Sequence, residues 1–180
     1  MGGGDKGLLD LGGRPVIAHV IERLGCARAI SANGDPARFA PFGLPVLPDV
    51  LPDHPGPLAG VLAGMDWAAA QGFRAIVTAA ADTPFFPRDL AAALADEATR
   101  TGAPIVLAAA MTPEGMRRHP VFGWWSTDLR DDLRSALAGG LHKIVLWTDA
   151  HGAARVEFPG ADPFFNINTP GDLATARAML

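Results

Sequence analysis

One apolar run near the middle of the chain limits the possible folds more than any other feature. Residues 74–81 read Arg-Ala-Ile-Val-Thr-Ala-Ala-Ala, a nearly continuous apolar segment. A strand that is covered on one face alternates apolar and polar residues, whereas a strand covered on both faces does not. The run is therefore typical of a strand in a parallel sheet with helices on both faces, and it predicts an α/β protein.

Helical and extended segments alternate along the rest of the chain. Apolar residues recur at helical spacing in 58–70, and Pro15 precedes another such pattern. The predicted helices are 15–24, 36–42, 58–70, 87–101, 128–138 and 172–180; the predicted strands are 29–32, 44–47, 74–81, 105–110 and 121–125, and 143–147 is ambiguous. This alternation predicts a doubly wound, mostly parallel sheet with helices on both faces, which binds its ligand at the carboxyl ends of the strands.

Length and composition narrow the classes of function. The 180 residues contain no repeat or linker, which predicts one domain over 1–180. The net charge of −4 argues against a general nucleic-acid or anionic-membrane partner. No apolar run approaches the roughly 18 residues of a membrane span, and without a leader pattern we expect a cytoplasmic protein. Cys26 is the single cysteine, which excludes a disulfide within the chain and a thiolate metal site.

Two segments suggest phosphate and metal binding. In Gly2-Gly3-Gly4-Asp5-Lys6, glycine N–H groups can approach phosphate oxygens and Lys6 adds a positive charge. The alternative is a loose terminus with a solvated lysine. Asp82 follows the apolar run directly, and a carboxylate at a strand end can hold Mg²⁺, which keeps waters and shares substrate phosphates. Alternatively, Asp82 caps the turn at Thr83-Pro84.

Polar side chains at other strand ends could bind a heterocycle or sugar. Ser31-Ala32-Asn33 can donate to and accept from a purine edge, although Asn33-Gly34 is also a common turn. The proline-rich loop 48–60, which contains Asp49 as its second residue, is stiff enough to hold a base or a ribose. Asp53 and His54 in that loop could form an acid–base pair, but adjacent loop residues more often point apart.

The second half of the chain adds two further candidates. Asn166 and Asn168 lie on the same side of an extended segment and could grip a polar heterocycle, while Thr169-Pro170 is also a good helix start. The segment 117–120, Arg-Arg-His-Pro, could offer cations to an anionic substrate or could be a solvated turn.

Several of these motifs, taken in order, closely resemble the molybdenum cofactor guanylyltransferases over the whole chain. They are Gly2-Gly3-Gly4-Asp5-Lys6-Gly7-Leu8-Leu9, Gly56-Pro57-Leu58-Ala59-Gly60, Asp82-Thr83-Pro84, His119-Pro120 and Asn166-Ile167-Asn168-Thr169-Pro170. The resemblance implies a Rossmann-like nucleotidyltransferase fold that transfers GMP from GTP to molybdopterin and releases pyrophosphate. It also implies Mg²⁺ as cofactor, with other cofactor-biosynthesis proteins and the recipient molybdoenzymes as candidate partners.

The resemblance assigns roles to individual residues. Lys6 matches the phosphate-loop lysine, Asp82 the magnesium aspartate, and Asp49 an aspartate that contacts the guanine nucleotide. Ser31 and Asn33 stand where the family often has Asn-x-Asn. Asn166 and Asn168 match the closing motif on the pterin side, with His119 near it. We therefore expect Lys6 and Asp82 to be catalytic, Asp82 to bind the metal, and Ser31, Asn33 and Asp49 to bind the nucleotide with them.

Two departures from the family leave alternatives open. The family begins with a strand and a Leu-Ala-Gly-Gly segment that would precede Met1, and the connection around Cys26 is a few residues short. Since that strand is central in the family's sheet, we expect an open groove in the core and a full chain that begins upstream of Met1. The alternatives are a cytidylyl- or sugar-nucleotide transferase of the same fold, and a catalytically inactive module that binds the pterin cofactor.

Overall fold

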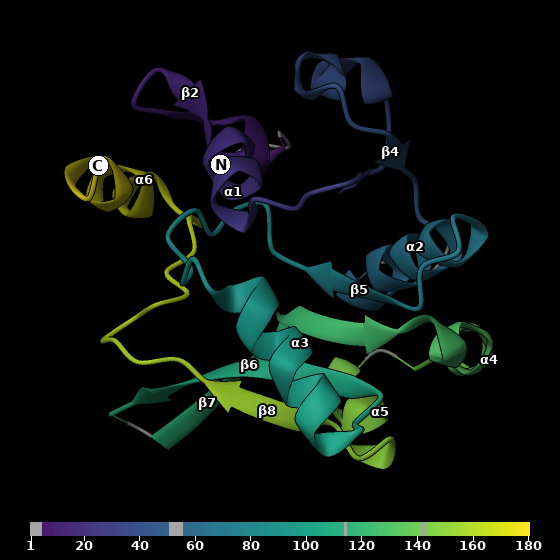
Figure 1. The fold of residues 1–180 in the computed structure, drawn as a ribbon. Helices are drawn as coiled ribbons and strands as arrows, with labels where there is room; N and C mark the ends of the chain where they lie inside the picture. Colours follow the sequence, from purple (N-terminus) through teal and green to yellow (C-terminus); the bar gives the residue numbers. More distant parts are fainter. Residues whose placement is uncertain (1–4, 51–55, 114, 142) are drawn as a thin grey trace.

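A four-stranded sheet forms the centre of the computed structural model, which describes residues 5–50, 56–113, 115–141 and 143–180 (Figure 1). The strand order is β5 (Ala75–Thr78), β7 (Gly115–Ser126), β6 (Ile105–Thr112) and β8 (Ala154–Glu157). β7 is antiparallel to both neighbours, and β6 is parallel to β8. The sheet is thus mixed where we expected a mostly parallel one. β6 ends at Thr112 and β7 begins at Gly115, too short a connection for the crossover that a parallel pair needs.

Helices cover both faces of this sheet, as predicted. Val106, Ala108 and Ala110 of β6 pack in one apolar cluster with α3 (Leu90–Thr101). Ile105 and Leu107 of the same strand pack in a second cluster with helices α2 (Pro57–Ala70), α4 (Arg130–Ala138) and α5 (Ile144–Ala150). Because successive strand residues point to opposite faces, a strand between two helical layers must be apolar throughout.

A second, smaller pair of strands lies apart from the central sheet. β3 (Ile30–Ser31) runs parallel to β4 (Val46–Leu47). In the part of the chain that the structure describes, β5 pairs with β7 alone and β3 with β4 alone. Residues of β3 and β5 line a cavity of about 1020 Å³, together with apolar side chains of α1 (Val16–Leu24) and α2.

The remaining elements differ from the sequence prediction mainly at short segments. The segment 36–42 is a 3₁₀ helix, η2 (Pro36–Phe42), and the ambiguous 143–147 belongs to helix α5. The last helix, α6 (Pro170–Ala178), starts at a capping box formed by Thr169 and Asp172. Three strands and two 3₁₀ helices were not predicted: β8, the hairpin of β1 (Asp10–Leu11) and β2 (Arg14–Pro15), η1 (Lys6–Leu8) and η3 (Thr127–Leu129).

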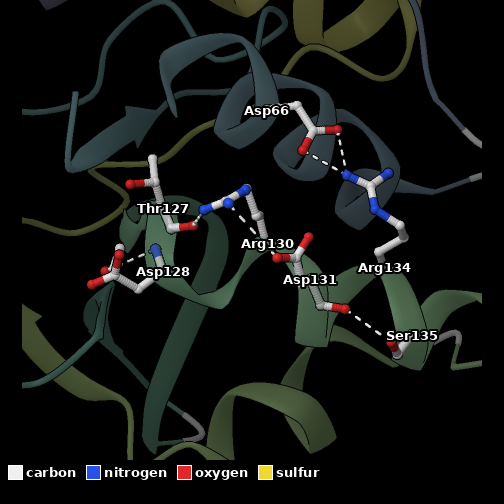
Figure 2. A network of polar contacts seen from close by, with 8 residues as sticks. Asp66, Thr127, Asp128, Arg130, Asp131, Arg134 and Ser135 are labelled. Atoms are coloured by element: carbon white, nitrogen blue, oxygen red, sulfur yellow. Dashed lines mark hydrogen bonds and ion pairs between the residues drawn. The ribbon is translucent and has the colours of Figure 1, made fainter. Parts of the chain in front are cut away.

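Polar contacts add to the packing of α2 on α4. Arg134 Nη2 lies 2.6 and 2.8 Å from the two carboxylate oxygens of Asp66 (Figure 2). Arg130 donates to the carbonyl of Thr127 at 3.2 Å at the start of the same helix. The Asp66–Arg134 contact therefore ties α2, whose first turn borders the cavity, to α4. None of the helices in the described ranges combines the length and the apolar character that crossing a membrane requires.

Candidate functional site

The cavity between β3 and β5 gathers most of the residues that the sequence singled out. The lining includes Lys6, Ser31, Asn33, Asp49, Asp82, His119 and Asn166. Asn168 accepts a hydrogen bond from one of these residues, Lys6. The carboxyl ends of β3, β4 and β5 lead into this cavity, which explains why residues so far apart in the sequence meet there.

Lys6 joins the two ends of the chain at the cavity. Its Nζ lies 2.6 Å from Oδ1 of Asn168. The backbone N–H groups of Asn168 and Thr169 donate to Asp172 at 2.9 and 2.8 Å. These two backbone donors, with a smaller contribution from the Lys6 charge, hold the pKa of Asp172 below its ordinary value. Asn168 is therefore oriented by a helix cap and in turn orients Lys6.

Close packing brings Lys6 toward the end of the β5 segment. A Cβ added at Gly7 would lie 3.2 Å from Cβ of Ala81, so η1 and the residues after β5 are in near contact at this point. Lys6 directly precedes Gly7 and Asp82 directly follows Ala81 in the sequence, and both line the cavity. A side chain at position 7 would force η1 or the residues after β5 to shift.

The environment of Asp82 leaves its carboxylate accessible to a ligand. Its backbone carbonyl accepts a hydrogen bond from Ile167 N–H at 2.8 Å. Its Oδ1 accepts from the buried Thr83 hydroxyl at 3.2 Å. Among the described residues, no backbone N–H donates to this carboxylate, so the alternative of a turn cap finds no support there.

Asn33 and Asp49 form a reciprocal pair across the ends of β3 and β4. Asn33 Nδ2 donates to Asp49 Oδ2 at 2.7 Å, and Asp49 N–H donates to Asn33 Oδ1 at 2.9 Å. The first turn of α2 approaches closely, because a Cβ at Gly60 would lie 2.7 Å from Ser31 Oγ and 3.9 Å from Asp49 Oδ1. The turn interpretation of Gly34 also holds, since its φ is +81°.

His119 also lines the cavity and lies on an aromatic cluster. Its ring stacks on Phe164 with 4.3 Å between centroids, and Phe164 packs against Phe122 and Phe158. Burial, and then the charge of Arg117, lower the pKa of His119, so the neutral imidazole is favoured. Arg118 is paired with Asp149, which leaves it less available to an anionic substrate than we expected.

Some of the sequence hypotheses cannot be placed. Gly2, Gly3 and Gly4 of the expected phosphate loop and the proposed Asp53–His54 pair lie outside the described residues. Sequence reasoning missed Phe164, which supports His119, and Arg38, which contacts both Asp5 and Asn33. For Phe164, the one sequence signal of a functional role was its place beside the candidate Asn166 in Phe164-Phe165-Asn166. For Arg38, the sequence held no such signal.

Comparison with known proteins identifies the family. The MobA-like NTP transferase domain matches residues 1–153. A molybdenum cofactor guanylyltransferase of Cereibacter sphaeroides is 50% identical over 186 residues, covering 100% of this chain and 90% of the relative. One from Mesorhizobium japonicum is 46% identical over 190 residues, covering 100% and 89%. The chain belongs to the molybdenum cofactor guanylyltransferase family.

Solved structures show that this guanylyltransferase family member has a nucleotidyltransferase fold. Molybdopterin-guanine dinucleotide biosynthesis protein A from Archaeoglobus fulgidus superposes with a TM-score of 0.75 at 22% identity, covering 98% of this chain and 91% of that one. CMP:2-keto-3-deoxy-manno-octonic acid synthetase gives a TM-score of 0.76 at 15% identity, covering 97% and 90%. The Rossmann-like prediction is confirmed.

Nucleotidyltransferases of this kind typically use a divalent metal, and the residues of this guanylyltransferase family member fit one with few protein ligands. Within the described ranges, no group of three or more His, Cys, Asp or Glu lies together. Asp82 offers a partly exposed carboxylate in the cavity wall. A hard cation that keeps waters and takes further oxygens from phosphates matches such a donor set.

Proposed function

We propose that the chain transfers GMP from GTP to molybdopterin, releasing pyrophosphate and forming the guanine dinucleotide form of the cofactor. One observation carries the proposal. A chain that is 50% identical to a guanylyltransferase over its whole length places Lys6, Asp82, Asn33 and Asp49 around one cavity. The proposal includes Mg²⁺ as the metal, the cytoplasm as the location, and recipient molybdoenzymes and other cofactor-biosynthesis proteins as partners.

The Asn33–Asp49 end is the proposed guanine site. Guanine carries adjacent N–H donors at N1 and N2, which a carboxylate accepts together, whereas cytosine lacks this donor pair. The Asn33 side chain donates one hydrogen bond to the Asp49 carboxylate and accepts one from the Asp49 backbone N–H, so the carboxylate is already ordered before a ligand binds. Ser31 Oγ, beside Gly60, adds a hydroxyl for the base or the ribose.

The Lys6–Asp82 end is the proposed phosphate site. Lys6 is directed by Asn168 and supplies a positive charge for the phosphates that leave as pyrophosphate. Asp82 would hold Mg²⁺, which when bound supplies neutralisation of phosphate charge. The chain's contribution is to hold these two opposite charges on one rim of the cavity.

The part of the cavity that His119 and Asn166 line is the proposed acceptor site. His119 and Asn166 line the cavity there, and Asn168 reaches Lys6. A neutral imidazole and an amide can both donate to and accept from a polar pterin ring. The acceptor's terminal phosphate oxygen would then form a bond to the α-phosphorus as the bond to the leaving pyrophosphate breaks. No covalent enzyme intermediate is needed, and catalysis is positioning and charge neutralisation.

A pyrophosphate-release assay with molybdopterin, Mg²⁺ and either GTP or CTP tests the proposal. We expect turnover with GTP and turnover with CTP at least about 100-fold slower, since a site built for specific hydrogen bonds rejects a base that lacks them. Preference for CTP would overturn the choice of nucleotide. Molybdopterin binding with no turnover of any nucleotide would favour a binding module instead.

A further inference from the structure

Arg38 stands next to the proposed nucleotide site and outside the cavity lining. It belongs to η2, which is anchored by the following residue, because Phe39 is buried with Ile17 and Ile30. The Arg38 guanidinium carbon lies 4.9 Å from the centre of the Phe39 ring. A fixed helix and a cation–π contact hold the arginine in one place.

A single terminal nitrogen of Arg38 connects two loops of the site. Nη2 donates to the backbone carbonyl of Asn33 and lies 3.2 Å from Oδ2 of Asp5. Asp5 precedes Lys6, and Asn33 holds Asp49. Arg38 therefore joins the segment that carries the phosphate-site lysine to the segment that carries the guanine-site carboxylate.

Two further observations describe the surroundings of the Arg38 guanidinium. A Cβ at Gly34 would lie 2.9 Å from Arg38 Nη1, so glycine leaves room for the guanidinium. The Arg38 and Asp5 side chains are only 32% and 31% exposed, which strengthens their attraction compared with a fully solvated pair. Hydrogen bonds donated by a charged guanidinium are also shorter and stronger than those between neutral groups.

We propose that Arg38 is a positioning residue for GTP: through Asp5 and Asn33 it sets the separation between the phosphate site at Lys6 and the guanine site at Asp49. This inference rests on the proposed function. It predicts that loss of Arg38 weakens GTP binding and leaves molybdopterin binding unchanged, because within the described residues Arg38 makes its hydrogen bond and ion pair with Asn33 and Asp5 and not with His119, Asn166 or Asn168.

The test compares Arg38→Met, Arg38→Lys and the control Arg100→Met. Arg100 pairs with Glu97 on α3 at 2.7 Å, outside the cavity lining. For Arg38→Met we expect the GTP Kd from calorimetry and the GTP KM to rise about tenfold, a usual coupling between neighbouring charged groups. The molybdopterin KM should stay within twofold. Arg38→Lys keeps the charge and should recover part of the loss, and Arg100→Met should bind GTP like the unmodified protein.

A double-variant cycle separates positioning from general stabilisation. In an Asp5→Asn background, Arg38→Met should raise the GTP Kd by clearly less than in the unmodified protein. Equal GTP Kd values for Arg38→Met and Arg100→Met, with only thermal stability lowered, would overturn the inference. If Arg38→Met does not fold, the GTP Kd values of Arg38→Lys and Asp5→Asn are compared with that of Arg100→Met instead. Failure of the unmodified protein to use GTP would instead overturn the proposed function.

Discussion

Two arginine–aspartate pairs of similar exposure belong to very different surroundings. Arg134 and Asp66 are 40% and 27% exposed, and Arg38 and Asp5 are 32% and 31% exposed. Arg134 of α4 contacts Asp66 of α2 (Figure 2). These two helices already share an apolar cluster that includes Leu62 and Leu133. Arg38 joins two loops at the cavity. The same chemistry is thus expected to add stability in one place and to set ligand geometry in the other.

The surrounding packing explains the difference. β6 has six consecutive buried residues between two helical layers. β3 and β4 have two residues each, and their carboxyl ends are tied by the Asn33–Asp49 side chains. Where apolar packing is extensive, a polar contact is an addition. Where it is sparse, polar contacts decide the arrangement, and the following predictions test this contrast.

The largest effect is expected at the cavity carboxylate. Asp82→Ala should lower kcat at least about 1000-fold, because it removes the proposed metal ligand and the charge that orients the phosphates. Thermal stability should change little, since the carboxylate's hydrogen bond is to the neighbouring Thr83. Pyrophosphate release and thermal unfolding measure both effects. Asp96→Ala, an exposed carboxylate on α3, is the control. Near-normal turnover of Asp82→Ala would remove this residue from the mechanism.

Lys6 provides the next effect in size. Lys6→Met should lower kcat/KM for GTP about 100-fold, the loss commonly seen when one charge-stabilising donor is removed. Lys143→Met, the exposed lysine before α5, should keep full activity. Asn168→Ala should show a smaller loss than Lys6→Met, because the lysine remains but loses its 2.6 Å partner. Equal activities of the two lysine variants would contradict the phosphate-site assignment.

The helix pair should respond in stability alone. Arg134→Met is expected to lower the free energy of unfolding by about 1 kcal/mol or less, as for a partly exposed ion pair. The corresponding shift in Tm is about 2–4 °C for a chain of this size. Chemical unfolding measures the change, and the GTP KM should stay within twofold. A tenfold rise in that KM would contradict the claim that the Arg134 pair affects stability alone, whereas the Arg38 pair affects GTP binding.

The smallest effect concerns pH. Because burial and Arg117 lower the pKa of His119 in the folded chain, the unfolded chain binds more protons near pH 6. The stability associated with neutral His119 is complete above its unfolded pKa of about 6.5 and declines as pH falls toward the folded value. His119→Gln should therefore reduce the loss of stability between pH 7.5 and 5.5, measured by urea unfolding. An NMR titration that puts the His119 pKa above 6.5 would reverse the sign.

Sequence patterns located the features that depend on local periodicity or on strand ends. The apolar face of 58–70 predicted helix α2 to within one residue at its start. The apolar run 105–110 predicted most of strand β6. Asp82 and Asp49 were found because polar residues that follow strands meet at one sheet edge. The structure brings these residues to one cavity, and their roles remain predictions.

Features that depend on contacts distant in sequence could not be found in this way. The reversal of β7 depends on a hairpin, and the segment 115–120 mixes glycine, arginine, histidine and proline, which hides a strand. The short apolar stretch that became α5 fits a strand or a helix equally by pattern. Arg38 and Phe164 gain their roles from residues far along the chain, Asp5 and His119 respectively.

The central claim is that one cavity holds GTP with its phosphates at Lys6 and Asp82 and its base at Asp49. A crystal structure with Mg²⁺ and a GTP analogue that cannot be cleaved at the α-phosphorus tests this most directly. We expect phosphate oxygens within hydrogen-bond distance of Lys6 Nζ, a metal at the Asp82 carboxylate and guanine against Asp49. A base bound beside His119, or a nucleotide outside the cavity, would contradict the account.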